Sequence, residues 1–370
     1  MRLLAVIGTL RLGGAERSLT GLAGSLTQRG HQVTIVDLMP PGEAPFWTLP
    51  DDIEHIRLGC IAAGDRIDYL RAYTRLRRVI RQASPDLVLG FTTLGNLLAA
   101  TATIGSGFPL VVAERVDPTA HAQRIGRLKT RLRDIAYARA DHVVVQTRHA
   151  RRALAYVQDE RISIIPNAVP IAAALARPAE PASDGRFRLR TLGRLSPEKG
   201  YDVLIGAFAK LAGRFPLWDL VLHGEGPFRG RLEAEISHFR LGGRIRLPGA
   251  TRDGAAELAD TNILAFPSHY EGFPNALAEG MAAGLPVVTM AGIGGTEELI
   301  VDGVTGLLAS WTDPETTLAD RLAALMADKA QRLRLGEAAR RHVSQFSPAL
   351  HDDRWEDALM RVTRRRGPGA

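Results

Sequence analysis

The chain lacks several features that would by themselves define a protein class. Its 370 residues include one cysteine, Cys60, which cannot form a disulfide within the chain and which we expect to be a packing residue in a reducing compartment. There is no apolar run of the roughly 18 residues that a membrane-spanning helix needs. The start, MRLLAVIGTL, favours a first strand over a signal peptide. We therefore expect a cytoplasmic globular protein.

The signatures of several catalytic classes are also absent. There is no CxxC, HExxH or GxSxG, and no DxD pair that would hold Mg²⁺ on a diphosphate. We therefore expect no metal and no resident cofactor. GxGxxG is missing as well, which argues against an NAD-dependent oxidoreductase, although that class stays an alternative for a chain of this architecture.

Positive charge is abundant but comes from few lysines. The net charge is +7, and lysine occurs four times, at 129, 199, 210 and 329. Such a balance indicates an anionic partner, whether nucleic acid, an acidic membrane surface or a phosphorylated substrate. The alternative is a basic, solvated surface without a specific ligand.

Short β-rich runs alternate with helical patterns along the whole chain. The first half has six such runs, at 3–8, 32–38, 86–91, 109–114, 142–147 and 161–166. The second half has six more, at 187–192, 219–224, 244–249, 262–267, 285–290 and 306–309. Apolar runs spaced by helices predict parallel strands buried on both faces. The pattern predicts an α/β protein of two Rossmann-like, doubly wound domains.

The predicted boundaries follow from composition. We assign residues 1–170 to the first domain, 187–347 to the second and the Ala- and Pro-rich stretch 171–186 to a linker. The amphipathic segment 348–366 follows the second sheet and is expected to cross back onto the first domain. Because ligands bind at the carboxyl ends of parallel strands, we expect the two domains to face each other across a central cleft.

The segment EGFPNALAEG, residues 271–280, follows a predicted strand and opens a helix. Pro274 suits the first helical position, where its missing N–H costs nothing. A carboxylate beside a diphosphate would be repelled, so Glu271 and Glu279 should bind uncharged sugar and ribose hydroxyls on either side of it. The alternative is an exposed helix with no ligand. At the start of this helix, the backbone N–H groups of Asn275, Ala276 and Leu277 would be free to bind a phosphate.

The segment GRLSPEKG supplies cations at a second strand end. Arg194 directly follows the strand, and Lys199 stands where the next helix begins. Arginine binds phosphate oxygens in a bidentate way and lysine acts as a point charge, so the two suit a diphosphate whose negative charge grows as it leaves. An ordinary exposed turn is the alternative interpretation.

Other strand ends carry weaker signals. The glycines of RLGGAERSL, among them Gly14, let a backbone approach an anion at a helix start. The segment HGEGP, with Gly224, either shapes a nucleotide site or only makes a tight turn. In AERVDP, Glu114 and Arg115 either face an acceptor or form a surface ion pair of little energetic value.

In combination these motifs resemble a known family. The segments GGAERSL, GRLSPEKG, HGEGP, PSHYEGFPNALAEGMAAGLPVV and GGTEELIVDGVTGLL resemble the retaining glycosyltransferases of family 4, which have the GT-B fold. The resemblance covers most of the chain and is strongest over 190–310. It implies a nucleotide-sugar donor, expected to be a UDP-sugar, in the second domain and an acceptor in the first. It also implies sugar transfer with retention and without an obligatory metal.

The resemblance assigns roles to the matching positions. Arg194 and Lys199 would bind the diphosphate, with Gly14 near the phosphates. Glu271 would contact the transferred sugar, and Glu279 the ribose hydroxyls. Many relatives carry a histidine where this chain has AERVDP, which resembles a variant seen in transferases of lipid-linked or surface polysaccharides. A catalytic role for Glu114 is therefore the weakest of these assignments.

The basic residues cluster in the first domain, in the segments 71–82, 124–140 and 148–152. The middle segment combines arginines with Ile125, Leu128 and Leu132, which suits an anionic membrane surface. We expect a peripheral membrane enzyme with a lipid-linked or glycan acceptor. We expect no nucleic-acid partner, because the carboxylates of 271–279 would not favour binding of a polyanion. Solvated helices, and a GT-B sugar-nucleotide epimerase, are the alternatives.

Overall fold

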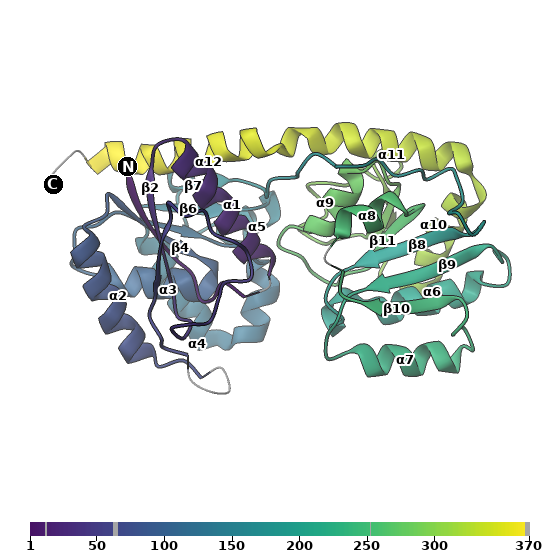
Figure 1. The fold of residues 1–370 in the computed structure, drawn as a ribbon, viewed down its shortest axis with the longest axis horizontal. Coiled ribbons are helices and arrows are strands. Elements are labelled where there is room, and N and C mark those ends of the chain that lie inside the picture. Colours follow the sequence, from purple (N-terminus) through teal and green to yellow (C-terminus); the bar gives the residue numbers. More distant parts are fainter. Residues whose placement is uncertain (12, 62–65, 252, 367–370) are drawn as a thin grey trace. The chain divides into compact units, whose positions relative to one another are not determined.

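The structure is a computed structural model and describes residues 1–11, 13–61, 66–251 and 253–366. The chain divides into two compact units. The first unit comprises Met1–Ala168 with Ala349–Ala370, and the second comprises Val169–Pro348. Each unit is built around one parallel sheet (Figure 1).

The first unit has a seven-stranded sheet in the order β3-β2-β1-β4-β5-β6-β7. Every neighbouring pair in it is parallel. Its strands are β1 (Arg2–Val6), β2 (Gln32–Asp37), β3 (Glu54–Arg57), β4 (Leu87–Phe91), β5 (Leu110–Ala113), β6 (His142–Val145) and β7 (Ile162–Ile164). Its helices are α1 (Gly14–Gln28), α2 (Tyr69–Ala83), α3 (Thr92–Ala102), α4 (Pro118–Arg139), α5 (Arg148–Ala153) and α12 (Pro348–Arg366), with the short 3₁₀ turn η1 (Asp159–Arg161).

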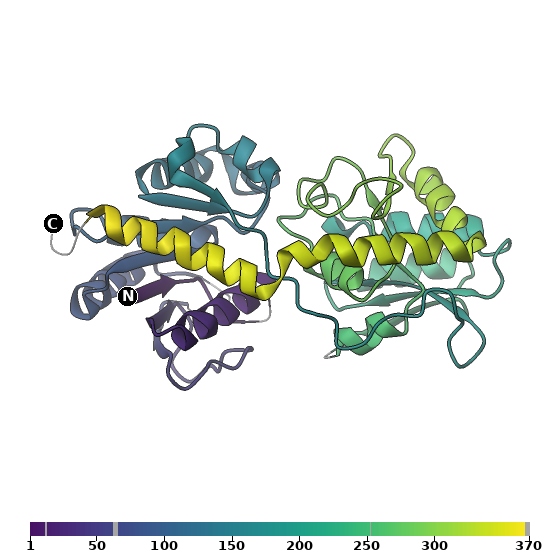
Figure 2. The same ribbon diagram turned by 90° about the horizontal axis from the view of Figure 1, so that it is seen from above.

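Two apolar clusters cover the two faces of this sheet. One contains residues of α2, α3, α4 and α5, and the other contains residues of α1 and α12. The helix α12 lies beside α1 (Figures 1 and 2), where Asp352 accepts from Ser25 Oγ at 2.6 Å and Glu356 pairs with Arg29 at 2.7 Å. The buried side of α12 includes Trp355. The C-terminal helix therefore completes the first unit.

The second unit has a six-stranded parallel sheet in the order β10-β9-β8-β11-β12-β13. Its strands are β8 (Phe187–Leu192), β9 (Trp218–His223), β10 (Ile245–Gly249), β11 (Ile263–Phe266), β12 (Val287–Met290) and β13 (Leu307–Ala309). Its helices are α6 (Tyr201–Leu211), α7 (Arg229–His238), α8 (Gly254–Ala259), α9 (Asn275–Ala282), α10 (Pro314–Ala327) and α11 (Lys329–Val343), with the 3₁₀ turns η2 (Pro197–Lys199) and η3 (Ser344–Phe346).

The predicted α/β class with two doubly wound, Rossmann-like units is confirmed. All six strands expected in the second half are present, and in the first half the pattern misses only β3. That strand reads EHIR, has no fully buried residue and lies at the sheet edge, so it carries no apolar run that could have revealed it.

The stretch 171–186, predicted as a linker, lies along the second unit. Ala176 N donates to Ala283 O at 2.8 Å, and Asn262 Nδ2 donates to Glu180 O at 2.6 Å. The Arg332 guanidinium donates to Pro178 O at 2.6 Å. These bonds satisfy backbone groups that a free linker would leave to water.

Candidate active site

The candidate site of the second unit forms where β8 and β11 end. Lys199 closes the turn η2 after β8, and Glu271 stands in the loop between β11 and α9. Lys199 Nζ lies 2.5 Å from Glu271 Oε1, although the two residues are 72 positions apart in sequence. The ammonium also lies 5.2 Å from the centre of the Phe266 ring. The structure thus brings together two of the residues that the motifs single out.

A glycine makes this meeting possible. Gly200 has φ +64°, and a Cβ there would lie 2.2 Å from the carbonyl oxygen of Pro267. The loops after β8 and β11 therefore touch backbone to backbone, and His269 N also donates to Glu198 O at 2.8 Å. The close approach sets where the lysine side chain begins. The glycine of the motif EKG thus has a steric cause.

The ion pair is only partly covered. The side chain of Lys199 is 19% exposed and that of Glu271 is 14% exposed. At this degree of burial water screens the charges less than at the surface, and the pair stays within reach of a solute. It is therefore suited to exchange one ionic partner for another.

The helix α9 begins beside Glu271, one residue later than the sequence predicted. Pro274 is the N-cap, with φ −81° and ψ 88°, and the first helical residue is Asn275. The first bond within the helix runs from Ala278 N to Pro274 O, so the N–H groups of Ala276 and Leu277 lie before the helical ladder starts. No side chain caps this end. The predicted donor groups are therefore at a helix start that faces the β11 loop.

Glu279 lies on the second turn of α9 and is partly buried. Arg194, in the loop after β8, is exposed, and within the described part of the chain its guanidinium makes no hydrogen bond or ion pair. A long, exposed arginine can therefore swing toward an anion near Lys199 without breaking an existing contact. The structure brings the two motif cations to the same loop.

Close backbone packing also explains why position 224 is a glycine. A Cβ at this position would lie 1.8 Å from the carbonyl oxygen of Gly193, and one at Gly226 would lie 2.2 Å from that of Leu195. Both glycines of HGEGP thus let the loop after β9 pack on the loop that carries Arg194. These contacts explain the glycines without a nucleotide.

The loop after β12 adds a third wall. A Cβ at Gly295 would lie 2.9 Å from both Glu271 O and Gly272 O, so this loop touches the backbone beside the acid. Residues 294–299 form a continuous run of turns, in which Thr296 N and Oγ1 both bond to Ile293 O at 2.9 Å. The threonine hydroxyl satisfies the carbonyl locally and competes with helix formation.

In the first unit, Gly14 is the first residue of α1 and Gly13 is its N-cap. A Cβ on Gly13 would lie 2.0 Å from Glu16 Oε2, so the Glu16 carboxyl folds over the start of the helix. Burial raises the pKa of Glu16 above its ordinary value, against a backbone hydrogen bond that lowers it. An anion approaching Gly14 would have to displace this acid.

Glu114 and Arg115, predicted on the acceptor side, are both buried. Glu114 is 1% exposed and Arg115 is 6% exposed. Glu114 accepts from Tyr137 Oη at 2.8 Å and from the N–H groups of Arg115 and Val116 at 2.9 and 3.2 Å. Burial raises its pKa, against these hydrogen bonds. A group in this environment holds the turn between β5 and α4 together and cannot touch an acceptor without a local opening.

The Arg115 guanidinium is also held within the unit, but only through Nη2, because its Nε and Nη1 are buried without a hydrogen-bond partner among the described residues. It donates to Ser18 Oγ at 2.8 Å and to Asn167 Oδ1, and it lies 4.8 Å from the centre of the Phe91 ring. Burial lowers its pKa. The prediction that this pair faces a ligand therefore finds no support in the geometry of the unit.

An acid–histidine pair that the motifs did not predict lies near the same strand end. Asp117 is the N-cap of α4 and accepts from Thr119 N at 2.8 Å. Its other oxygen lies 3.3 Å from His149 Nε2 on α5. The sequence VDP did signal the cap, because an Asp before a helix-starting Pro is typical of one. Nothing local could show that a histidine 32 residues later would meet it.

Within the described residues, no group of three or more His, Cys, Asp or Glu side chains could hold a metal ion. In the same part of the chain no helix is long and apolar enough to cross a bilayer.

Two family models match the chain. Glycosyl transferases group 1 matches residues 175–342, and Glycosyltransferase Family 4 matches residues 12–173. An α-1,4-N-acetyl-D-galactosaminyltransferase of Campylobacter jejuni, whose name specifies a saccharide on diphospho-undecaprenol, is 25% identical over 98% of this chain and 99% of its own length. The chain is also 32% identical, over 207 residues, to an exopolysaccharide phosphotransferase of Streptomyces coelicolor. That match covers 56% of this chain and only 21% of the phosphotransferase.

Solved structures show the same fold. HepE of Anabaena, crystallised with UDP and glucose, superposes with a TM-score of 0.81 at 20% identity, over 97% of this chain and 99% of that one. The likeness identifies the fold as GT-B. The relatives named here give no support to the oxidoreductase or epimerase alternatives.

Proposed function

The chain belongs to family 4 of the glycosyltransferases, and we propose that it is a retaining transferase of a hexose or N-acetylhexosamine from a UDP-sugar. The observation that carries the proposal is the contact of Lys199 with Glu271 at 2.5 Å, beside the start of α9. A cation for the diphosphate and an acid for the sugar thus stand side by side. The UDP complex of HepE favours uracil as the base.

The donor diphosphate would lie between the η2 turn and the start of α9. Lys199 keeps two of its three N–H donors for phosphate oxygens while the third contacts Glu271. Arg194 would close over the diphosphate from the loop after β8. The N–H groups of Asn275, Ala276 and Leu277 would add the positive end of a helix. Glu279, one turn along, would take the ribose hydroxyls.

Glu271 would bind a hydroxyl of the transferred sugar. In the reaction the bond from the anomeric carbon to the diphosphate oxygen breaks, and a bond from that carbon to the acceptor oxygen forms on the same face. The acceptor proton passes to the departing phosphate oxygen. The negative charge that develops on the leaving group is stabilised by fixed cations and helix amides.

Side-chain cations would take the place of a metal ion at this site. Lys199 and Arg194 would neutralise the leaving diphosphate, so we expect no dependence on divalent ions. A chelator added to the assay should leave the initial rate unchanged. A rate that falls with chelator and returns with Mg²⁺ or Mn²⁺ would remove this part of the proposal.

The acceptor would be a lipid-linked or other glycan bound by the first unit, at the membrane surface on its cytoplasmic side. On α4 a stripe of apolar side chains is solvent-exposed, with Leu128 at 72%, Leu132 at 50% and Ile135 at 58%. Exposed apolar residues at this spacing lie on one face of the helix, and arginines flank them, as membrane-surface helices require. Arg133 belongs to the segment 124–140 that was predicted to form a basic surface, but it is buried and donates to Pro118 O at 2.9 Å.

Vesicle flotation tests the membrane contact. Wild-type protein should float with phosphatidylglycerol vesicles, and the Leu128→Ser, Leu132→Ser double variant should stay at the bottom of the gradient. Leu217→Ser serves as the control, because Leu217 is a similarly exposed leucine (54%) in the second unit. Flotation of the double variant at the wild-type level would exclude the stripe.

A panel of nucleotide sugars tests the activity. Each is scored for thermal stabilisation and for hydrolysis or transfer, with wild type, Glu271→Ala and Lys199→Ala side by side. Lys210→Ala is the matched control, because Lys210 also pairs with an acid, Glu315, at 3.4 Å, but outside the site. If Glu271→Ala and Lys199→Ala both behaved like wild type, the site assignment would be wrong.

A further inference from the structure

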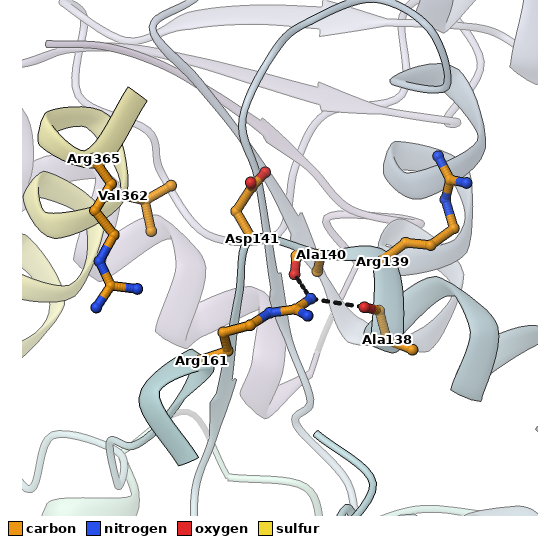
Figure 3. Close-up of a pocket in the computed structure, with 7 residues that line it drawn as sticks. All are labelled: Ala138, Arg139, Ala140, Asp141, Arg161, Val362 and Arg365. Atoms are coloured by element: carbon orange, nitrogen blue, oxygen red, sulfur yellow. Dashed lines mark hydrogen bonds between the residues drawn. The ribbon is translucent and has the colours of Figure 1, made fainter. Parts of the chain in front are cut away.

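A pocket in the first unit lies where the basic segment 124–140 ends, away from Gly14 and Glu114. It has a volume of about 380 Å³ and is formed by residues 138–141, Arg161 and two residues of α12, Val362 and Arg365 (Figure 3). The segment 138–141 ends α4 and leads into β6. The pocket therefore stands at the amino ends of the strands, whereas Glu114 and Gly14 stand at carboxyl ends or beyond them.

Arg161 is fixed in this pocket by the backbone. Its Nη2 donates to Ala138 O at 2.7 Å and to Ala140 O, which are carbonyls at the end of α4 (Figure 3). Within the described residues, its Nε and Nη1 make no hydrogen bond. A guanidinium held through one nitrogen keeps donors for a second ligand, and it loses little further freedom on binding one.

Positive charge dominates the pocket. Arg139 and Arg365 line it together with Arg161, and neither Arg139 nor Arg365 forms an ion pair with a described residue. Asp141 is the one carboxylate in the lining, and its Oδ2 accepts from Leu110 N at 2.8 Å. Arg161 and Arg365 thus border the pocket beside a single acid that already serves the backbone, whereas the Arg139 guanidinium points away from them (Figure 3).

The neighbouring histidine is buried and lies within the field of the same arginines. His142, the first residue of β6, is 6% exposed. Burial is the largest cause that lowers its pKa, and together with the positive charges of Arg361, Arg365 and Arg161 it brings the pKa to about 4. A cation is therefore disfavoured at this edge of the sheet and an anion is favoured.

We propose that this pocket binds a phosphate group. The planar fork of an arginine matches the oxygens of a phosphate, and arginines from two separate elements, Arg161 and Arg365, can hold it from two sides. Val362 supplies an apolar wall, which suits a phosphate carrying an organic substituent. The phosphate belongs either to a small soluble compound or to a lipid headgroup.

A ligand in this pocket would connect the residues beside β7 with the end of α12. Arg161 lies beside β7, while Val362 and Arg365 come from α12, about 200 residues later in the chain. A phosphate shared by Arg161 and Arg365 would hold the last turns of α12 on the first unit. Arg139 lies one turn after Ile135 of the exposed stripe, so a lipid lying along α4 would place its headgroup here.

Calorimetric titration with inorganic phosphate tests the site. The titrations use a Lys199→Ala background, because the proposed donor site also binds phosphate. Adding Arg365→Ala should weaken phosphate binding about tenfold, the cost of losing one charge-assisted contact. Arg81→Ala is the control, since Arg81 is an exposed arginine on α2 of the same unit. Arg365 is preferred to Arg161 as the probe because Arg161 also bonds to the end of α4.

A second arm separates the two sources of phosphate. Co-sedimentation with phosphatidylglycerol vesicles, against phosphatidylcholine, compares Arg365→Ala with Arg81→Ala. A loss confined to the calorimetric titration supports a soluble phosphate compound, and a loss in vesicle binding supports a lipid headgroup. If Arg365→Ala matches Arg81→Ala in both assays, the proposal is overturned. Sugar transfer by Arg365→Ala should stay at the wild-type rate, so failure here is distinct from failure of the proposed activity.

Discussion

Each unit places an acid and a base near the carboxyl end of a strand, but in different surroundings. In the second unit, Lys199 and Glu271 stay 19% and 14% exposed and bind chiefly each other. In the first, Glu114 and Arg115 are almost fully buried and are held by Tyr137, Ser18 and Asn167. The Lys199–Glu271 pair of the second unit can exchange its partners for a ligand, and the buried Glu114–Arg115 pair of the first unit cannot. Burial and the number of fixed partners therefore separate a binding pair from a structural pair.

The largest effect should come from the partly exposed Lys199–Glu271 pair. Glu271→Gln and Lys199→Ala should each lower kcat/KM for transfer by about 10²–10³, because each removes a group that stabilises charge or holds the reacting sugar. Their melting temperatures should stay near that of wild type. Steady-state kinetics measures the change, with Lys210→Ala as the unchanged control. Activity near wild type in either variant would show that Lys199 and Glu271 are not the ligand-binding pair of the second unit.

The buried pair should show the opposite pattern. Glu114→Ala should destabilise the first unit by about 3–5 kcal/mol, because it leaves buried donors, including Tyr137 Oη, without their acceptor. Urea unfolding measures the loss, and Glu160→Ala, at an exposed acid in the same unit, is the control. If Glu114→Ala kept full stability but lost transfer activity, Glu114 would be catalytic and the contrast between the units would fail.

Gly200→Ala should both destabilise and inactivate. The new Cβ would meet Pro267 O at 2.2 Å, and the φ of +64° is unfavourable for alanine, so we expect about 2 kcal/mol of lost stability. Lys199 would move away from Glu271 as the loops separate. Gly185→Ala is the matched control, with φ +75° but open space around it. Equal effects in the two variants would show that the contact between the loops is unimportant.

The smallest expected effect is a pH dependence in the first unit. His142 keeps a pKa of about 4 in the folded state, because of burial and nearby arginines, against about 6.5 when unfolded. Below pH 6.5 the unfolded chain binds the proton first, so stability falls from pH 7 to pH 5 by roughly 1–2 kcal/mol. His142→Asn should flatten that slope in urea titrations, while His238→Asn, at an exposed histidine, should not.

The sequence predicted the sheets and the loops of the site well, since both depend on local signals. Buried parallel strands read as apolar runs, and strand–glycine–helix junctions are visible as motifs. The predicted start of α9 was one residue too early, because Pro274 serves as the N-cap and not as the first helical residue.

What the sequence could not show depends on contacts between distant residues. Nothing near Glu114 indicates that Tyr137 will cover it, or that Asn167 will meet Arg115. The pairing of Lys199 with Glu271 spans 72 positions and needs Gly200 to pack on Pro267. In the stretch 171–186 the composition suggested an interdomain linker, while its hydrogen bonds run to side chains and loops much later in the chain.

The most direct test of the central claim measures UDP binding by calorimetry to wild type, Lys199→Ala and Glu271→Ala. In the proposed site Lys199 binds the diphosphate and Glu271 binds the sugar. Lys199→Ala should therefore bind UDP at least about tenfold more weakly. Glu271→Ala should bind UDP at least as tightly as wild type, because it removes a carboxylate that competes for the ammonium, and yet it should not transfer sugar. Loss of UDP affinity in Glu271→Ala to the extent seen in Lys199→Ala would contradict the account.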